Sequence, residues 1–181
     1  MNNKIEIRLG GSGGQGLILG GIILAEAAIL DGKNAIQAQS YGPEARGGAS
    51  KAEVIICDGE IDFPKVQHAD VLLALTQLAC DKYLPSLKLN GLLILDEGID
   101  INPISFENFH VVRIPIIKTA VEKLGKSMVA NIIAMGAIRN LTNAVSVDSL
   151  QKAVLKRVPP GTEDLNKQAL EEGYLLTQSH A

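Results

Sequence analysis

The feature that most constrains the fold is a run of glycines close to the N-terminus, between two segments of different periodicity. Residues 5–9 alternate apolar and charged side chains, which is typical of a β-strand. Residues 17–30 are rich in Leu, Ile and Ala and predict a helix that is buried on more than one side, by its own sheet or by a partner chain. The glycine run at residues 11–16 fits the pattern G-x-G-x-x-G, in the strand-to-helix context that this motif requires.

Glycines in this position let the backbone come close to a ligand, and the helix that follows presents free N–H groups to it. We interpret the run as a site for a phosphate or carboxylate; the alternative is a turn that only packs helix against strand. No Lys-Ser or Lys-Thr follows Gly16, so the run is not a P-loop. Residues 37–40 hold no acid to bind a ribose, which disfavours a nicotinamide dinucleotide. The candidate ligand contacts are Gly11, Ser12, Gly13, Gly14, Gln15 and Gly16.

A second loop, residues 40–50, is rich in Gly and Pro around one Tyr, one Glu and one Arg. In a doubly wound sheet it would leave the carboxyl end of the neighbouring second strand, beside the glycine run, in the crevice where such sheets bind ligands. Arg46 offers a planar fork for a phosphate or carboxylate. The alternative is that Arg46 only pairs with Glu44 at the surface. The candidate ligand contacts in this loop are Tyr41, Gly42, Arg46, Gly47 and Gly48.

The rest of the chain alternates short apolar runs with helical segments. We expect further strands at residues 35–38, 52–57, 71–75, 91–95 and 111–114, and helices at residues 76–83, 117–124, 127–138, 147–158 and from 162 onward. Continuous apolar strands between helices predict a parallel sheet covered on both faces. The predicted fold class is therefore α/β, a doubly wound, mostly parallel, Rossmann-like sheet with helices on both faces, in a single domain spanning residues 1–181.

Local signals mark several helix ends. Gly32 suits the left-handed position after helix 17–30, and Ser146 and Thr162 are the candidate N-caps of the last two helices. Asn131 is the one polar residue inside the apolar helix 127–138. We interpret Asn131 as a structural residue bonded to nearby backbone, with an interface contact as the alternative.

Composition excludes several classes of function. The net charge of −3 argues against a face that holds a nucleic-acid backbone, and an aromatic content of 3% is too low for base-stacking platforms. The longest apolar run, residues 17–30, is too short to span a bilayer. No cleavage signal precedes the first strand, so we expect a cytoplasmic protein that does not contact the membrane.

The residues that usually carry metals or catalysis are sparse. Cys57 and Cys80 are too few for a disulfide scaffold or a four-ligand zinc site, and we expect both to be small buried residues. His68, His110 and His180 share no ligand spacing, so we expect no metal site. No catalytic constellation can be assembled, and we assign no catalytic residue.

Taken together, the two loops resemble those of a known family. The glycine run followed by residues 40–48 is similar to the gamma subunit of 2-oxoacid:ferredoxin oxidoreductases, most closely to the 2-oxoglutarate type. The two loops together are highly specific for this family, whereas either loop alone is not. The resemblance covers essentially the whole chain and includes residues 60–64, 68–70, 91–96, Asn131, residues 135–137 and residues 161–166.

The resemblance implies a subunit of an enzyme rather than a complete enzyme. The family oxidatively decarboxylates a 2-oxoacid with coenzyme A (CoA), giving acyl-CoA, CO2 and reduced ferredoxin, and uses thiamine diphosphate, Mg²⁺ and iron–sulfur clusters. This chain has no Cys-x-x-Cys and no Gly-Asp-Gly, so the resemblance assigns the clusters and thiamine diphosphate to alpha, beta and possibly delta subunits. Ferredoxin would be reached through the complex, and we expect no cofactor on this chain alone.

Two alternatives stay open at this point. One is the small subunit of an indolepyruvate:ferredoxin oxidoreductase, which shares this domain, and the other is a free Rossmann-like nucleotide-binding module. The helices at 17–30 and 127–138 are apolar on more than one face, which predicts that the isolated chain is a homo-oligomer.

Overall fold

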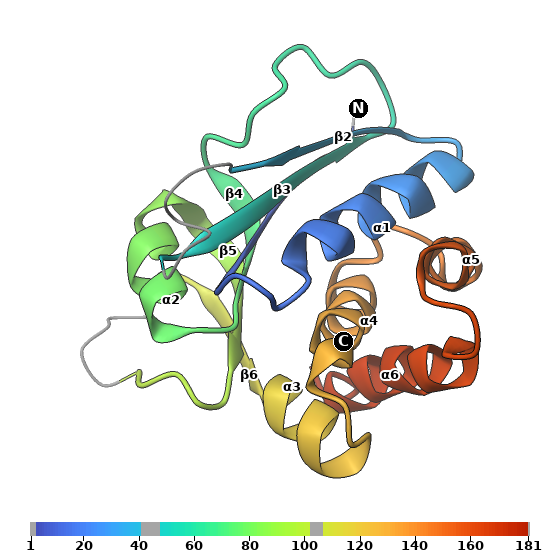
Figure 1. Ribbon diagram of the computed structural model, residues 1–181. Coiled ribbons are helices and arrows are strands. Elements are labelled where there is room, and N and C mark those ends of the chain that lie inside the picture. The colour runs from blue at the N-terminus through green and yellow to red at the C-terminus, as the bar shows by residue number, and fades with distance from the viewer. Residues whose placement is uncertain (1–2, 41–47, 102–106, 181) are drawn as a thin grey trace.

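The computed structural model describes residues 3–40, 48–101 and 107–180. Within these residues, six strands form one sheet in the order β2-β3-β1-β4-β5-β6 (Figure 1). The strands are β1 (Lys4–Gly11), β2 (Asn34–Gln39), β3 (Ser50–Cys57), β4 (Ala69–Ala74), β5 (Leu87–Asp96) and β6 (His110–Ile114). The helices are α1 (Leu17–Leu30), α2 (Gln77–Tyr83), α3 (Ile116–Lys118), α4 (Ala130–Thr142), α5 (Val147–Arg157) and α6 (Glu163–Leu176). The α/β class predicted from the sequence is confirmed.

The sheet is mostly parallel, as predicted, but its first strands are arranged differently. β1, β4, β5 and β6 are parallel neighbours. β3 lies antiparallel between β2 and β1, so β2 is an edge strand rather than the neighbour of β1. The reason is the length of the connection: only residues 40–49 separate β2 from β3, and a parallel connection needs a dozen or more residues.

Helices cover both faces of the sheet unequally. α1, α4, α5 and α6 lie on one face, and the short α2 lies on the other (Figure 1). Successive side chains of a strand point to opposite faces of the sheet, and each face has its own hydrophobic cluster. In β1, Ile7 and Leu9 pack into the larger cluster, on the side of α1 and α4. The smaller cluster on the opposite face includes Leu72, Leu93 and Tyr83 of α2.

The two most apolar helices are covered by their own chain. α1 begins and ends where the sequence predicts and packs against β2, β3, α4 and α5. In α4, every residue from Ala130 to Ile138 is buried, between the sheet, α1 and α6. The apolar character of these helices is therefore accounted for within one molecule, and it no longer supports the predicted homo-oligomer.

α4 and α6 approach each other at two facing glycines. A Cβ atom on Gly136 would lie 2.4 Å from the carbonyl oxygen of Leu170, and one on Gly173 would lie 2.1 Å from that of Ile133. Distances this short cannot be accommodated without moving backbone. The two glycines therefore set the distance between the helices, and they join α6 to the body of the domain.

The helix ends show which local signals were correct. Gly32 has a φ of 77°, and Ser146 Oγ accepts a hydrogen bond from the N–H of Ser149 at 3.1 Å, both as predicted. Thr162 stands at the N-cap of α6 but its side chain makes no capping bond there; its hydroxyl donates to the carbonyl of Pro159 instead. The helix predicted at 117–124 is the short α3 followed by one π-helical turn, η3 (Thr119–Lys123). In the described part of the chain, no helix combines the length and hydrophobicity needed to cross a membrane.

Candidate functional site

The glycine run and the described ends of the second predicted loop lie at the same edge of the sheet, its carboxyl edge. β1 ends at Gly11, and Ser50, the first residue of β3, is paired directly opposite it. The neighbouring strand β4 ends beside Gly10, whose carbonyl accepts from the N–H of Leu75 at 2.9 Å. The second loop leaves β2 at this same edge, since β2 and β1 point the same way and the N–H of Ser40 donates to the carbonyl of Lys51.

The glycine run turns the chain by using conformations that glycine adopts easily. Gly14 and Gly16 have φ values of 86° and 72°, in the left-handed region that other residues rarely occupy. A Cβ on Gly14 would meet no atom within 4 Å, so the outer face of the loop is open. Ser12 and Gly13 are also exposed. The open face leaves room for a ligand to approach this backbone closely.

Gln15 holds the loop in shape. The N–H of Ser12 donates to Gln15 Oε1 at 2.7 Å, which closes the turn with a side chain from within it. A Cβ on Gly11 would lie 2.3 Å from that same oxygen, so a side chain at position 11 would displace the Gln15 side chain from this bond. The structure thus gives Gln15 and Gly11 a positioning role, which the motif alone did not reveal.

Asn131 of α4, far from the glycine run in the sequence, holds the end of this loop in place. Its Nδ2 donates to the carbonyl oxygen of Gly16 at 3.1 Å, although 115 residues separate the two. A Cβ on Gly16 would lie 2.6 Å from that nitrogen. Asn131 is 3% exposed, and its Oδ1 has no hydrogen-bond partner among the described residues. The interpretation of Asn131 as a residue bonded to nearby backbone is confirmed.

The electric field at the start of α1 favours a bound anion. No side chain from the described residues caps the helix at Gly16, and its first turn contains no acidic residue. The N–H groups of a first helical turn lack partners within the helix and carry partial positive charge. Together with the open face of the loop, this arrangement suits a phosphate or a carboxylate.

The second loop is described only in part. Tyr41, Gly42, Arg46 and Gly47 lie outside the described residues, so their candidate roles stay predictions. Gly48 is described and half-buried, at the same edge as the glycine run. Next to this loop, Lys51 Nζ is 2.9 Å from Glu53 Oε1, so that cation is committed to an ion pair.

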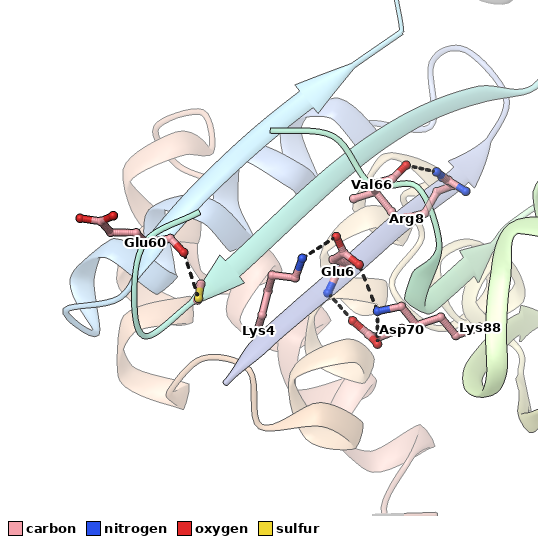
Figure 2. A network of polar contacts seen from close by, with 8 residues as sticks. Lys4, Glu6, Arg8, Glu60, Val66, Asp70 and Lys88 are labelled. Atoms are coloured by element: carbon pink, nitrogen blue, oxygen red, sulfur yellow. Dashed lines mark hydrogen bonds and ion pairs between the residues drawn. The ribbon is translucent and has the colours of Figure 1, made fainter. Parts of the chain in front are cut away.

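A partly buried polar network, which the sequence did not predict, lies on the α2 face of the sheet (Figure 2). Lys88 Nζ donates to Glu6 Oε2 at 3.0 Å and to Asp70 Oδ1 at 2.8 Å, and Lys4 Nζ donates to Glu6 Oε1 at 3.1 Å. Burial by itself raises the pKa of the Glu6 carboxyl, but the hydrogen bonds from Lys88 and Lys4 outweigh it and hold this pKa below its ordinary value. The glutamate is therefore charged at neutral pH, which is a structural rather than a catalytic state.

Arg8 lies on the same face and is buried, at 5% exposure. Its Nε donates to Glu53 Oε1 at 2.9 Å across the β1–β3 pair, and its terminal nitrogens donate to the carbonyl of Val66 at 2.7 Å and to the hydroxyl of Ser86. Its guanidinium carbon also lies 5.9 Å from the centre of the Tyr83 ring. All these partners are structural, and the alternation of residues 5–9 indicated the strand without showing that its charged side is buried.

The remaining candidates for chemistry are inert. Cys57 and Cys80 are both buried, as predicted, and burial followed by the charge of Asp81 raises the pKa of Cys80 to about 11. Among the described residues, no three His, Cys, Asp or Glu side chains come together as a metal site. Asp96, at the end of β5, accepts from the N–H groups of Gly98 and Ile117 at 3.0 and 2.9 Å and so serves as a cap.

Comparison with known proteins gives a consistent relationship over nearly the whole chain. A family model described as pyruvate ferredoxin/flavodoxin oxidoreductase matches residues 6–176. The chain is 49% identical over 171 residues to the 2-oxoglutarate synthase subunit KorC of Methanocaldococcus jannaschii, a match that covers 93% of this chain and 91% of the relative. It also superposes on the gamma subunit of a keto/oxoacid ferredoxin oxidoreductase from Geobacter sulfurreducens PCA, with a TM-score of 0.89, 48% identity and 98% of each chain covered.

A further relative carries the same domain within a longer polypeptide. The ketoisovalerate oxidoreductase subunit VorA of Methanothermobacter thermautotrophicus is 30% identical over 176 residues, which cover 94% of this chain but 36% of VorA. The superposition agrees with the fold described above, and the sequence matches extend over nearly the whole chain. The chain belongs to the pyruvate ferredoxin/flavodoxin oxidoreductase family, among its gamma-type subunits.

Proposed function

We propose that this chain is the gamma subunit of a complex that oxidatively decarboxylates 2-oxoglutarate with CoA. In this reaction the carbon–carbon bond to the substrate's first carboxyl group breaks and CO2 leaves. The remaining acyl group is bonded to the CoA sulfur, and two electrons pass to ferredoxin. The observation that carries the proposal is the 49% identity to a 2-oxoglutarate synthase subunit with nearly complete coverage of both chains.

In this complex the cofactors for the chemistry would be held by the partner subunits of alpha, beta and possibly delta type. Thiamine diphosphate supplies the carbanion chemistry of decarboxylation, and iron–sulfur clusters accept the electrons. The sequence of this chain has neither a Cys-x-x-Cys nor a Gly-Asp-Gly segment with which to hold them. Its own contribution is to bind and orient.

We assign this contribution to the two loops at the carboxyl edge. The open backbone of Ser12–Gly14 and the uncapped start of α1 fit the phosphates of a coenzyme, either CoA or thiamine diphosphate. Arg46 is the one cation within residues 40–50 and would add a planar, charged donor pair. The absence of an acid at residues 37–40 makes a nicotinamide dinucleotide the poorer ligand.

The isolated chain should be inactive. Purified protein supplied with 2-oxoglutarate, CoA, thiamine diphosphate, Mg²⁺ and a viologen dye should give dye reduction no faster than a blank, because no group on this chain performs decarboxylation or electron transfer. The complex assembled with its partner subunits should reduce the dye under the same conditions, and 2-oxoglutarate should be a better substrate than pyruvate or indolepyruvate. Dye reduction by the chain alone would refute its role as a non-catalytic subunit.

Arg46→Ala should weaken the assembled complex without dissociating it. Loss of one charged hydrogen bond to a phosphate corresponds to about 1.5–3 kcal/mol, or roughly a 10- to 150-fold loss in kcat/KM. Gly13→Val should have a larger effect, because a branched side chain keeps the coenzyme away from the loop backbone. Lys152→Ala, which removes an exposed cation of α5, is the matched control and should behave like the wild type.

Kinetics with each coenzyme varied in turn separate the two phosphate sources. A raised KM for CoA alone identifies CoA, and a raised KM for thiamine diphosphate alone identifies that coenzyme. An Arg46→Ala complex with unchanged KM values, unchanged kcat and normal assembly would show that the second loop has only a structural role.

A further inference from the structure

A mostly apolar cavity of about 280 Å³ opens on the helical layer. It lies between the first turn of α1, the turn η4 (Ser127–Val129) with the start of α4, and the connection from α5 to α6. Leu19, Ile132, Val158 and Leu165 form its walls together with Asn131, and Met128 stands beside it. None of these residues belongs to the polar network, and Asn131 is the one that bonds to the glycine run, through the carbonyl of Gly16.

Two features of the cavity indicate that something outside the chain covers it. Met128 is 81% exposed, the largest exposed fraction among the large apolar side chains in the described part of the chain. Asn131 contributes to the wall, and its buried Oδ1 lacks a hydrogen-bond partner among the described residues. A buried acceptor without a partner is costly in a finished structure, so a donor supplied by another molecule would complete the site.

The cavity lies next to the candidate coenzyme site. Leu19 belongs to the first turn of α1, directly after the glycine run, and Asn131 donates to the carbonyl of Gly16. A molecule that covers the glycine run from the carboxyl edge would therefore reach the cavity as well. The volume is just below the range of about 300–1,000 Å³ that is usual for small-ligand pockets, and it suits an apolar anchor residue from a protein partner.

The lengths of the relatives indicate which protein covers the cavity. The match to VorA covers 94% of this chain but only 36% of VorA, so VorA joins this domain to a much larger piece in one polypeptide. The match to KorC covers 91% of that relative, so KorC carries no comparable piece, and the corresponding part of a KorC-type enzyme would be a separate subunit. Contacts that a longer chain maintains through covalent attachment must then be made by an interface.

We propose that the cavity beside Met128 is the docking site for that subunit, which inserts an apolar side chain with a neighbouring N–H or O–H group facing Asn131. The proposal rests on the proposed function, since it takes the partner to be the larger subunit of the same oxidoreductase. A second copy of this chain is the competing occupant. The sheet and α5 already cover α1, and α6 already covers α4, whereas the cavity is an apolar surface at this edge that no described residue covers.

The test compares two exposed apolar side chains on opposite parts of the domain. The affinity-tagged chain is co-expressed with the alpha- and beta-type subunits of its own enzyme, and the captured subunits are quantified. Met128→Asp should lower the captured amount at least tenfold, because docking would bury the new carboxylate in an apolar interface without a partner. Met128→Leu should restore capture. Leu89→Asp places the same charge on a residue 75% exposed in the amino half of β5, and it should capture as much as the wild type.

Normal thermal unfolding of the free variants shows that any loss of capture arises at the surface, and both aspartate variants should unfold like the wild type. Capture by Met128→Asp equal to the wild type overturns the docking site. It is also overturned if sedimentation shows a dimer of the free chain that Met128→Asp abolishes while capture persists. The activity of the wild-type complex tests the proposed function separately, so the two can fail independently.

Discussion

Replacing Gly173 with alanine should destabilise the domain by about 3 kcal/mol or more. The added Cβ would lie 2.1 Å from the carbonyl oxygen of Ile133 and 2.7 Å from the backbone nitrogen of Ala137. These atoms belong to α4, where every residue around them is buried, so α6 must move away as a unit. The gain of about 1 kcal/mol from the better helix propensity of alanine is too small to compensate. Urea unfolding followed by circular dichroism measures the difference.

The control for this substitution is another helical glycine. A Cβ on Gly20 of α1 would meet the Cε of Met135 at 3.1 Å, and the end of a flexible methionine side chain can move aside. Gly20→Ala should therefore be neutral within about 1 kcal/mol. Gly136→Ala should resemble Gly173→Ala, because its Cβ would lie 2.4 Å from the carbonyl oxygen of Leu170. Equal stability of Gly173→Ala and wild type would contradict the close helix contact.

Arg8→Ala should also be strongly destabilising, with a loss of about 3–5 kcal/mol in the free energy of unfolding. The substitution removes the guanidinium from a side chain that is 5% exposed and leaves the Glu53 carboxylate, itself 7% exposed, without its cross-strand partner. It also deprives the Val66 carbonyl of its charged donor. Lys51 still contacts Glu53 from a more exposed position, which places the expected loss near the lower end of the range.

Two further variants separate a buried pair from an ordinary ion pair. Arg8→Met combined with Glu53→Leu removes both charges at once, and it should recover most of the stability lost in Arg8→Ala. Lys152→Ala disrupts the exposed pair with Asp148, which should change stability by less than about 0.5 kcal/mol. The importance of the pair would be disproved if Arg8→Ala lost no more than Lys152→Ala.

Local periodicity predicted most of the elements but not how the first strands are paired. α1 begins and ends where the sequence indicates, and Gly32 ends it in the left-handed conformation. β3 is apolar throughout its second half, like the parallel strands, so composition does not reveal that it runs in the opposite direction. The short separation of the two strands, residues 40–49, was the available signal, since a parallel connection needs a dozen or more residues.

The candidate site was predictable as a position but not as a set of contacts. The glycine run lies at the predicted edge, and its open backbone agrees with an anion site. The role of Gln15 in closing the turn depends on a side-chain conformation that no motif specifies. The burial of Arg8 depends on α2 and residues 58–68 covering that face, which is a tertiary effect. The ligand contacts assigned to residues 41–47 stay predictions.

The bond between Asn131 and Gly16 has a consequence for how the molecule opens. It connects the first turn of α1 to the first turn of α4 across 115 residues of sequence. Local unfolding proceeds in cooperative units, and a unit includes whatever its internal bonds hold together. The glycine loop and the N-terminal end of α4 therefore form one unit, although neither is near the other in the chain. A coenzyme that orders the loop would also lower the frequency with which the N-terminal end of α4 frays. Binding at the carboxyl edge would therefore stabilise the helical layer as well.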